Sequence, residues 1–79
     1  MKINNENYIA EMCKIRLKRK KLKISIKEVA EYLGISRSAI SQYEGLRATL
    51  SDEMIDRYKN YLDMREKEQL QWVRRVNIL

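Results

Sequence analysis

Two short helix patterns joined by a single glycine constrain this chain more than any other feature of its sequence. Ser25 precedes the first pattern and Glu28 follows three residues later, a capping box in which each side chain should bond the other residue's backbone N–H. Gly34 ends that pattern, because glycine accepts the left-handed backbone that a helix C-terminus favours. Ser36 then caps a second pattern that runs to about Glu44. The sequence therefore predicts two short helices joined by a tight turn.

The rest of the chain also favours helices. It has 79 residues, no proline and two glycines, so it has few of the turn-forming residues that a β-rich fold requires. A helix is expected from after Asn4 or Asn5 to about Lys21, and Ser51 should cap another that continues to Leu62. Apolar residues at helical spacing are expected to form the core: Ile15, Val29, Leu33, Ile35, Ile40, Met54, Ile55, Tyr58 and Leu62. We therefore predict an all-α fold.

The net charge of +6 is confined to the N-terminal segment. Residues 1–23 hold eight Lys or Arg against two Asp or Glu, and the rest of the chain is balanced. Such a segment is either a solvated helix face or a surface that meets phosphates, and charge alone does not decide between them. All but one of these eight basic residues lie close together: Lys14, Arg16, Lys18, Arg19, Lys20, Lys21 and Lys23.

Composition argues against several classes of function. The chain has no His, one Cys, no glycine-rich phosphate loop and no acidic cluster at metal-ligand spacing. We therefore expect no enzyme activity, no metal, no cofactor and no small-molecule ligand. Cys13 is expected to be a small core residue. No apolar run reaches the roughly 20 residues of a membrane span, and the N-terminus lacks a signal-peptide pattern, which predicts a cytoplasmic protein.

The two central patterns together have the requirements of a helix-turn-helix unit, whose second helix enters the DNA major groove. Ala30 is small where the two helices should cross, and Gly34 makes the turn. The apolar residues that should pack the unit on the core are Val29, Leu33, Ile35, Ile40 and Tyr43. Four residues remain for the outer face of the second helix, and all can form hydrogen bonds while none is acidic: Arg37, Ser38, Ser41 and Gln42.

At these residues the chain resembles the Cro/cI-type (XRE) helix-turn-helix family of bacterial and phage repressors. The resemblance covers residues 15–62, and its strongest string is VAEYLGISRSAISQYE at residues 29–44. It implies a compact lambda-repressor-like bundle of four to five helices, with a DNA-binding domain over residues 1–62 and the helix-turn-helix proper at 26–44. It also implies that Arg19 and Glu44 form a buried structural ion pair and do not read DNA.

The chain departs from the family pattern at positions that usually touch phosphates. Family members carry glutamine where this chain has Ile26, which cannot donate a hydrogen bond. They also carry glycine one residue after Gly45, where this chain has Leu46, and proline near Leu50. We therefore expect a rebuilt loop after residue 44, and the basic first helix is a candidate replacement for the lost phosphate contacts.

The resemblance and the residue chemistry assign DNA contacts. Arg37 has two parallel donors that fit guanine O6 and N7, and Gln42 fits adenine or a phosphate. Ser38 and Ser41 are placed on the same base-reading face. Candidate phosphate contacts, which set register and salt dependence, are Ser36, Lys20, Lys21 and Arg47.

The last ten positions contain six sizeable apolar residues: Leu70, Trp72, Val73, Val76, Ile78 and Leu79. Residues 63–79 fit a helix and a strand about equally, and the absence of a breaker favours a helix over about 64–75. Surplus apolar surface at a terminus more often marks an interface. We therefore interpret the segment after about Glu68 as a dimerisation surface.

Two functions of different classes follow. The first is a sequence-specific transcriptional regulator, a repressor of phage or mobile-element type, which binds a pseudo-palindromic operator in double-stranded DNA as a homodimer. The second is a protein-interaction module on the same scaffold, such as an antitoxin-like partner or a phage-encoded inhibitor of a host nucleic-acid enzyme. Ile26 and the altered loop after Glu44 slightly favour the second, whereas the polar outer face at residues 37–42 favours the first more strongly. Non-specific RNA binding lacks the aromatic stacking platform that it requires.

Overall fold

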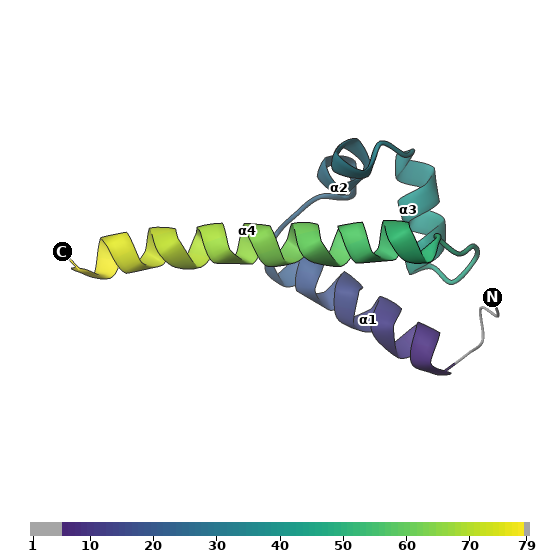
Figure 1. Cartoon of the computed structure of the whole chain (residues 1–79), viewed down its shortest axis with the longest axis horizontal. Helices are drawn as coiled ribbons and strands as arrows, with labels where there is room; N and C mark the ends of the chain where they lie inside the picture. Colours follow the sequence, from purple (N-terminus) through teal and green to yellow (C-terminus); the bar gives the residue numbers. More distant parts are fainter. Residues whose placement is uncertain (1–5, 79) are drawn as a thin grey trace.

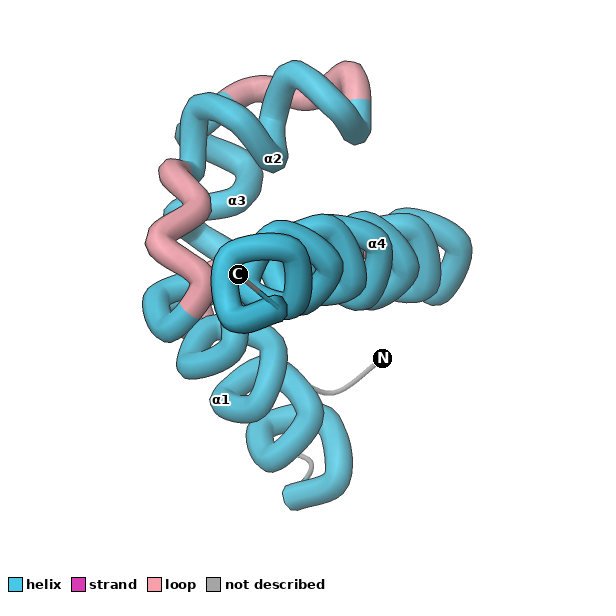
Figure 2. Tube along the Cα trace, turned by 90° about the vertical axis from the view of Figure 1, so that its left-hand side faces the viewer, coloured by secondary structure: helices cyan, strands magenta, loops and turns pink. Residues whose placement is uncertain are grey.

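Four α-helices make up the part of the chain that the computed structural model describes, which is residues 6–78, with side chains to Gln71. They are α1 (Glu6–Lys21), α2 (Ile26–Leu33), α3 (Arg37–Glu44) and α4 (Asp52–Ile78), and no strand occurs among these residues. In Figures 1 and 2, α4 passes between α1 on one side and the α2–α3 pair on the other. The predicted all-α bundle is confirmed.

Serine side chains begin three of the helices, as the sequence predicts. Ser25, Ser36 and Ser51 each accept a hydrogen bond from the backbone N–H three residues later, at 3.1, 3.0 and 3.2 Å. Each bond satisfies one of the N–H groups that a helix start leaves without an intrahelical partner. The caps therefore set where α2, α3 and α4 begin.

The capping box at α2 is only half formed. Ser25 accepts the N–H of Glu28 as predicted, but the Glu28 carboxylate accepts from the Tyr61 hydroxyl and from the Arg65 guanidinium of α4. A charge-assisted bond to Arg65 is stronger than a bond to a neutral backbone N–H. The glutamate therefore ties α2 to α4 instead of closing its own helix end.

Three helices are followed by a residue in the left-handed conformation. These residues are Lys23 (φ 60°), Gly34 (φ 73°) and Leu46 (φ 60°). After α3, Leu46 donates its N–H to Tyr43 O at 3.1 Å and Arg47 donates to Gln42 O at 2.8 Å, the two bonds of a Schellman motif. Leu46 thus takes a backbone conformation that glycine adopts more easily, at the position where the family pattern has glycine. The expected rebuilding of this loop stays a prediction.

Lys23 offers a test of the strain at these ends. Its side chain is exposed, so Lys23→Gly removes the left-handed penalty of roughly 1–2 kcal/mol without loss of packing. The higher entropy of unfolded glycine offsets part of this gain. We expect the free energy of unfolding to rise by about 0.5–1 kcal/mol, with a rise in Tm of about 2–8 °C by thermal melting. Lys23→Ala removes the same charge but keeps the strained conformation, so an equal rise in that variant would contradict the prediction.

The core lies where α1, α2, α3 and α4 meet. Fourteen buried apolar residues form it: Tyr8, Met12, Ile15, Leu22, Ile24, Val29, Ala30, Leu33, Ile40, Tyr43, Ile55, Tyr58, Tyr61 and Leu62. Ile35 and Met54, which the sequence also assigned to the core, are partly buried against it. Cys13 is exposed, so its predicted burial is wrong. The buried face of α1 runs through Met12 and Ile15, and Cys13 is rotated about 100° from Met12.

Helix α4 is a single element of 27 residues, about 40 Å long. The predicted helix near the C-terminus is therefore confirmed over the strand alternative, and it continues the preceding helix without a break at Leu62. Gln69 donates from its side-chain amide to Leu22 O at 3.0 Å, and beyond it α4 extends past the bundle (Figure 1). No helix in the described part of the chain is both long and apolar enough to cross a membrane.

Candidate nucleic-acid interface

The outer face of α3 carries the four side chains that the sequence proposed for base readout. Ile40 and Tyr43 are fully buried on the inner face of α3, and this packing turns the opposite face to solvent. The exposed residues on that face are Arg37, Ser38, Ser41 and Gln42. The structure therefore brings the predicted reading residues onto one accessible helix face.

Two of these side chains contact each other. Gln42 donates from Nε2 to Ser38 Oγ at 3.1 Å, one turn earlier on α3. Arg37 is exposed, and it forms no ion pair or hydrogen bond with any residue that the structure describes. An exposed arginine without an internal partner at the start of this helix can meet a base edge in two-donor geometry.

The residues predicted to contact phosphates lie at different positions on the surface. Ser36 uses its oxygen as the cap of α3 and keeps its hydroxyl proton for donation. Arg47 is exposed just after α3. Lys20 lines a recess with Ser41 of the reading face, whereas Lys21 lines a different recess with Gln69 and other residues of α4. The structure thus separates the two adjacent lysines.

Arg16 was not assigned to the site from the sequence. It lies one turn before Lys20 on α1, and it lines the same recess beside Ser41. Residues four apart on a helix share a face. The i, i+4 spacing of two cations was the signal that could have found this residue.

A buried ion pair fixes the end of α3 against α1. Arg19 donates from Nε and Nη2 to the two oxygens of Glu44, at 2.9 and 2.8 Å, and the two side chains are 9% and 5% exposed. Arg19 also donates from Nη1 to Ile24 O at 2.9 Å. The hydrogen bonds to Glu44 raise the pKa of Arg19, so the guanidinium stays charged. Both residues line the recess that also contains Lys20 and Ser41, but each is more than nine-tenths buried and bonded to the other.

Tyr58 adds α4 to this network, a role that its place in an apolar stripe did not indicate. Its hydroxyl donates to Glu44 Oε2 at 2.5 Å. Burial raises the pKa of Tyr58 far above its usual value, and the bond to Glu44 raises it further. One carboxylate therefore joins α1, α3 and α4, and it orients the reading helix on the bundle.

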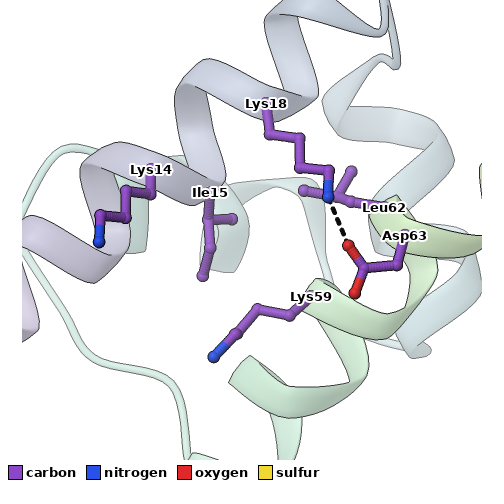
Figure 3. Close-up of a pocket in the computed structure, with 6 residues that line it drawn as sticks. All are labelled: Lys14, Ile15, Lys18, Lys59, Leu62 and Asp63. Atoms are coloured by element: carbon purple, nitrogen blue, oxygen red, sulfur yellow. Dashed lines mark hydrogen bonds and ion pairs between the residues drawn. The ribbon is translucent and has the colours of Figure 1, made fainter. Parts of the chain in front are cut away.

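A small pocket between α1 and α4 contrasts with this surface (Figure 3). Ile15 and Leu62 form its apolar floor, and lysines surround it. Lys18 pairs with Asp63, as Figure 3 shows, and its hydrogen bond to that carboxylate raises the pKa of Lys18. Lys59 pairs with Glu11 of α1, whereas Lys14 has no acidic partner among the described residues, so the positive charge at this pocket is neutralised only in part. No group of His, Cys, Asp and Glu among the described residues fits a metal ion.

A short helix with an exposed polar face, held by a preceding helix through a glycine turn, defines a helix-turn-helix DNA-binding fold. Residues 15–69 match the helix-turn-helix family HTH_3. The match covers more than half of the chain, so the protein belongs to this Cro/cI (XRE)-type family, whose members are DNA-binding transcription regulators. The comparisons with curated proteins and with solved structures gave no match.

Proposed function

We propose that this protein is a sequence-specific transcriptional repressor that binds a pseudo-palindromic operator as a homodimer, with α3 in the major groove. The observation that carries the proposal is the outer face of α3, where four exposed hydrogen-bonding side chains stand without an acidic residue. Phosphates repel acids, and base edges are read by such polar groups. The buried core of a protein–protein interface is usually more apolar than this face.

The residues divide into two roles under this proposal. Base readout falls to Arg37, Ser38, Ser41 and Gln42, and phosphate contact falls to Ser36, Lys20 and Arg47. Lys21 lies with α4 residues, and this position does not support the same role for it. Arg19 and Glu44 act by holding α3 in place.

Helix register supports the homodimer. In α4, Ile55, Tyr58 and Tyr61 face the core. The sequence places an apolar residue eighteen positions, or five helical turns, after each of them: Val73, Val76 and Leu79. The core stripe of α4 thus continues in sequence register past Gln69, where the bundle ends.

A second copy of the chain suits this extended stripe, because a two-fold interface between the two α4 ends would present two reading helices to one duplex. Leu70, the first of the proposed interface residues, is 56% exposed. The side chains of Trp72, Val73, Val76 and Ile78, and all of Leu79, lie outside the described residues. Their assignment to the dimer remains a prediction.

Enrichment of random DNA duplexes with the purified full-length protein tests the proposed function. A two-fold symmetric consensus, with half-sites about one helical turn apart, is the expected result. A single unpaired half-site would contradict the homodimer. No consensus at all, with weak salt-sensitive binding only, would contradict the regulator and favour the protein-interaction module.

Arg37 should carry part of the sequence preference. We expect Arg37→Ala to weaken binding to the enriched site by about 1–3 kcal/mol and to relax the choice at one base pair in each half-site. Arg37→Lys is the matched variant, because it keeps the charge but loses the two parallel donors. It should retain affinity for unrelated DNA and still lose the preference at that base pair. Titration against the preferred and substituted duplexes measures both, and unchanged preference in both variants would place readout elsewhere.

A further inference from the structure

We propose that Arg16 and Lys20 together bind one backbone phosphate of the duplex that α3 reads. This phosphate contact comes from α1 and takes the place of a contact that Ile26, at the start of α2, cannot make. The proposal rests on the proposed function, because it concerns the same DNA complex. It adds a named site and a residue that the sequence had not assigned.

The first argument is placement. Arg16 and Lys20 are exposed and lie one turn apart on α1. They line one recess, whose other lining residues are Arg19, Ile26, Ser41, Glu44 and Gly45. Ser41 also belongs to the reading face of α3, so the recess borders that face. A phosphate at the edge of the major groove would reach this border while α3 lies in the groove.

The second argument is unneutralised charge. Lys20 has no acidic partner in the described part of the chain. Arg16 has one carboxylate oxygen within reach, Glu44 Oε1 at 3.9 Å, and its side chain is 49% exposed. Glu44 already accepts two bonds from Arg19 and one from Tyr58. The recess therefore keeps a net positive charge.

The side of α1 that faces α4 carries several ion pairs. Lys18 pairs with Asp63 and Glu66 of α4, and Lys59 of α4 pairs with Glu11 of α1. Beside α4, Lys18 is thus paired, whereas Lys14 and Lys21 have no acidic partner among the described residues. A polyanion that approaches the reading face meets Arg16 and Lys20, because these two cations lie beside α3.

The chemistry of the two side chains fits a phosphodiester. Arginine offers a planar fork of donors to two phosphate oxygens, and lysine adds a point charge. Ile26 forms an apolar wall of the recess and donates nothing. The recess thus supplies charge and donors from α1 where the first residue of α2 supplies none.

The experiment uses the full-length protein and the duplex that it enriches, with Arg16→Gln, Lys20→Gln and the double variant. We expect the double variant to bind about five- to tenfold more weakly per half-site at about 0.1 M salt. The log–log salt slope should fall by about one unit per half-site, or about two units for the dimer. The base preference of the enriched site should not change, because a phosphate contact carries no sequence information. Lys21→Gln removes the same charge from the α4 side of α1 and should leave affinity and slope near those of the wild type.

A second measurement identifies the phosphate. Duplexes that carry one neutral methylphosphonate at successive positions should bind the wild type weakly at one position in each half-site, and the double variant should be insensitive there. Sensitivity that persists in the double variant would overturn the proposal, and so would an equal effect of Lys21→Gln. A wild type that binds no DNA would instead overturn the proposed function. Because Arg16 approaches Glu44, Lys20→Gln alone decides the outcome if Arg16→Gln lowers the melting temperature.

Discussion

Glu44→Ala is expected to lower the free energy of unfolding by about 3–5 kcal/mol. The variant leaves the Arg19 guanidinium buried without its counter-charge, and it removes the acceptor of the Tyr58 hydroxyl. For a domain of this size each kcal/mol shifts Tm by roughly 4–8 °C, so thermal melting should show a fall of at least about 12 °C. Total stabilities of small domains are about 5–15 kcal/mol, and the variant will be partly unfolded if the wild type lies at the lower end.

Glu31→Ala is the matched control for this loss. Glu31 is an exposed glutamate of α2, and its replacement should change stability by no more than about 0.5 kcal/mol. Melting of Glu44→Ala at the wild-type temperature would mean that the buried pair adds nothing to stability.

An apolar replacement of the whole network separates pairing from burial. We expect Arg19→Met, Glu44→Leu and Tyr58→Phe in one chain to recover part of the lost stability, because no charge or hydroxyl is then left unpaired in the core. The recovery should be incomplete, since Ile24 O loses the donor that Arg19 supplies.

A chain that ends after Gln71 is expected to fold and to lose most of its operator affinity. Among the residues whose side chains the structure describes, the buried apolar core lies at or before Leu62, and the truncation keeps the Gln69 bond to Leu22. It removes five of the six residues proposed for the dimer contact. Loss of the second half-site should weaken binding to the symmetric operator about a hundredfold or more, because the two half-sites no longer act together. Titration of the operator and light scattering measure the two effects.

The deletion also removes two positive charges, so it needs a control for electrostatics. Full-length Arg74→Gln with Arg75→Gln loses the same charges and keeps the apolar residues. It should remain dimeric and lose affinity only through its salt dependence. Light scattering that shows a dimer for the truncated chain would contradict the proposed interface, as would a monomeric full-length protein at tens of micromolar.

Signals from residues close together in the sequence were enough to predict the helix-turn-helix unit. Ser25, Ser36 and Ser51 began their helices as predicted, because a cap is a bond between residues three positions apart and needs nothing from the rest of the fold. Gly34 ended α2 for a similar local reason. The apolar spacing of α2 and α3 then determined which side of α3 would face solvent, and with it the polar face of residues 37–42.

Helix ends without glycine were not visible in the sequence. Lys23 and Leu46 adopt left-handed conformations that their side chains do not favour. Neighbouring residues impose them, since Leu22, Ile24 and Leu46 all pack on the core. Such strain arises only in the folded molecule, because the backbone preferences of lysine and leucine alone predict a negative φ at these positions.

What the sequence by itself determined was the class of fold, the starts of the helices and the exposed face of α3, all of which follow from contacts within one or two turns. What only the tertiary structure decided was the partner of each charge. Lys20 and Lys21 are neighbours in sequence, yet one lies beside α3 and the other beside α4. Tyr58 bonds Glu44, fourteen residues away, because packing brings α4 onto the end of α3. Charge pairing depends on distances between helices, and those distances exist only once the core has formed.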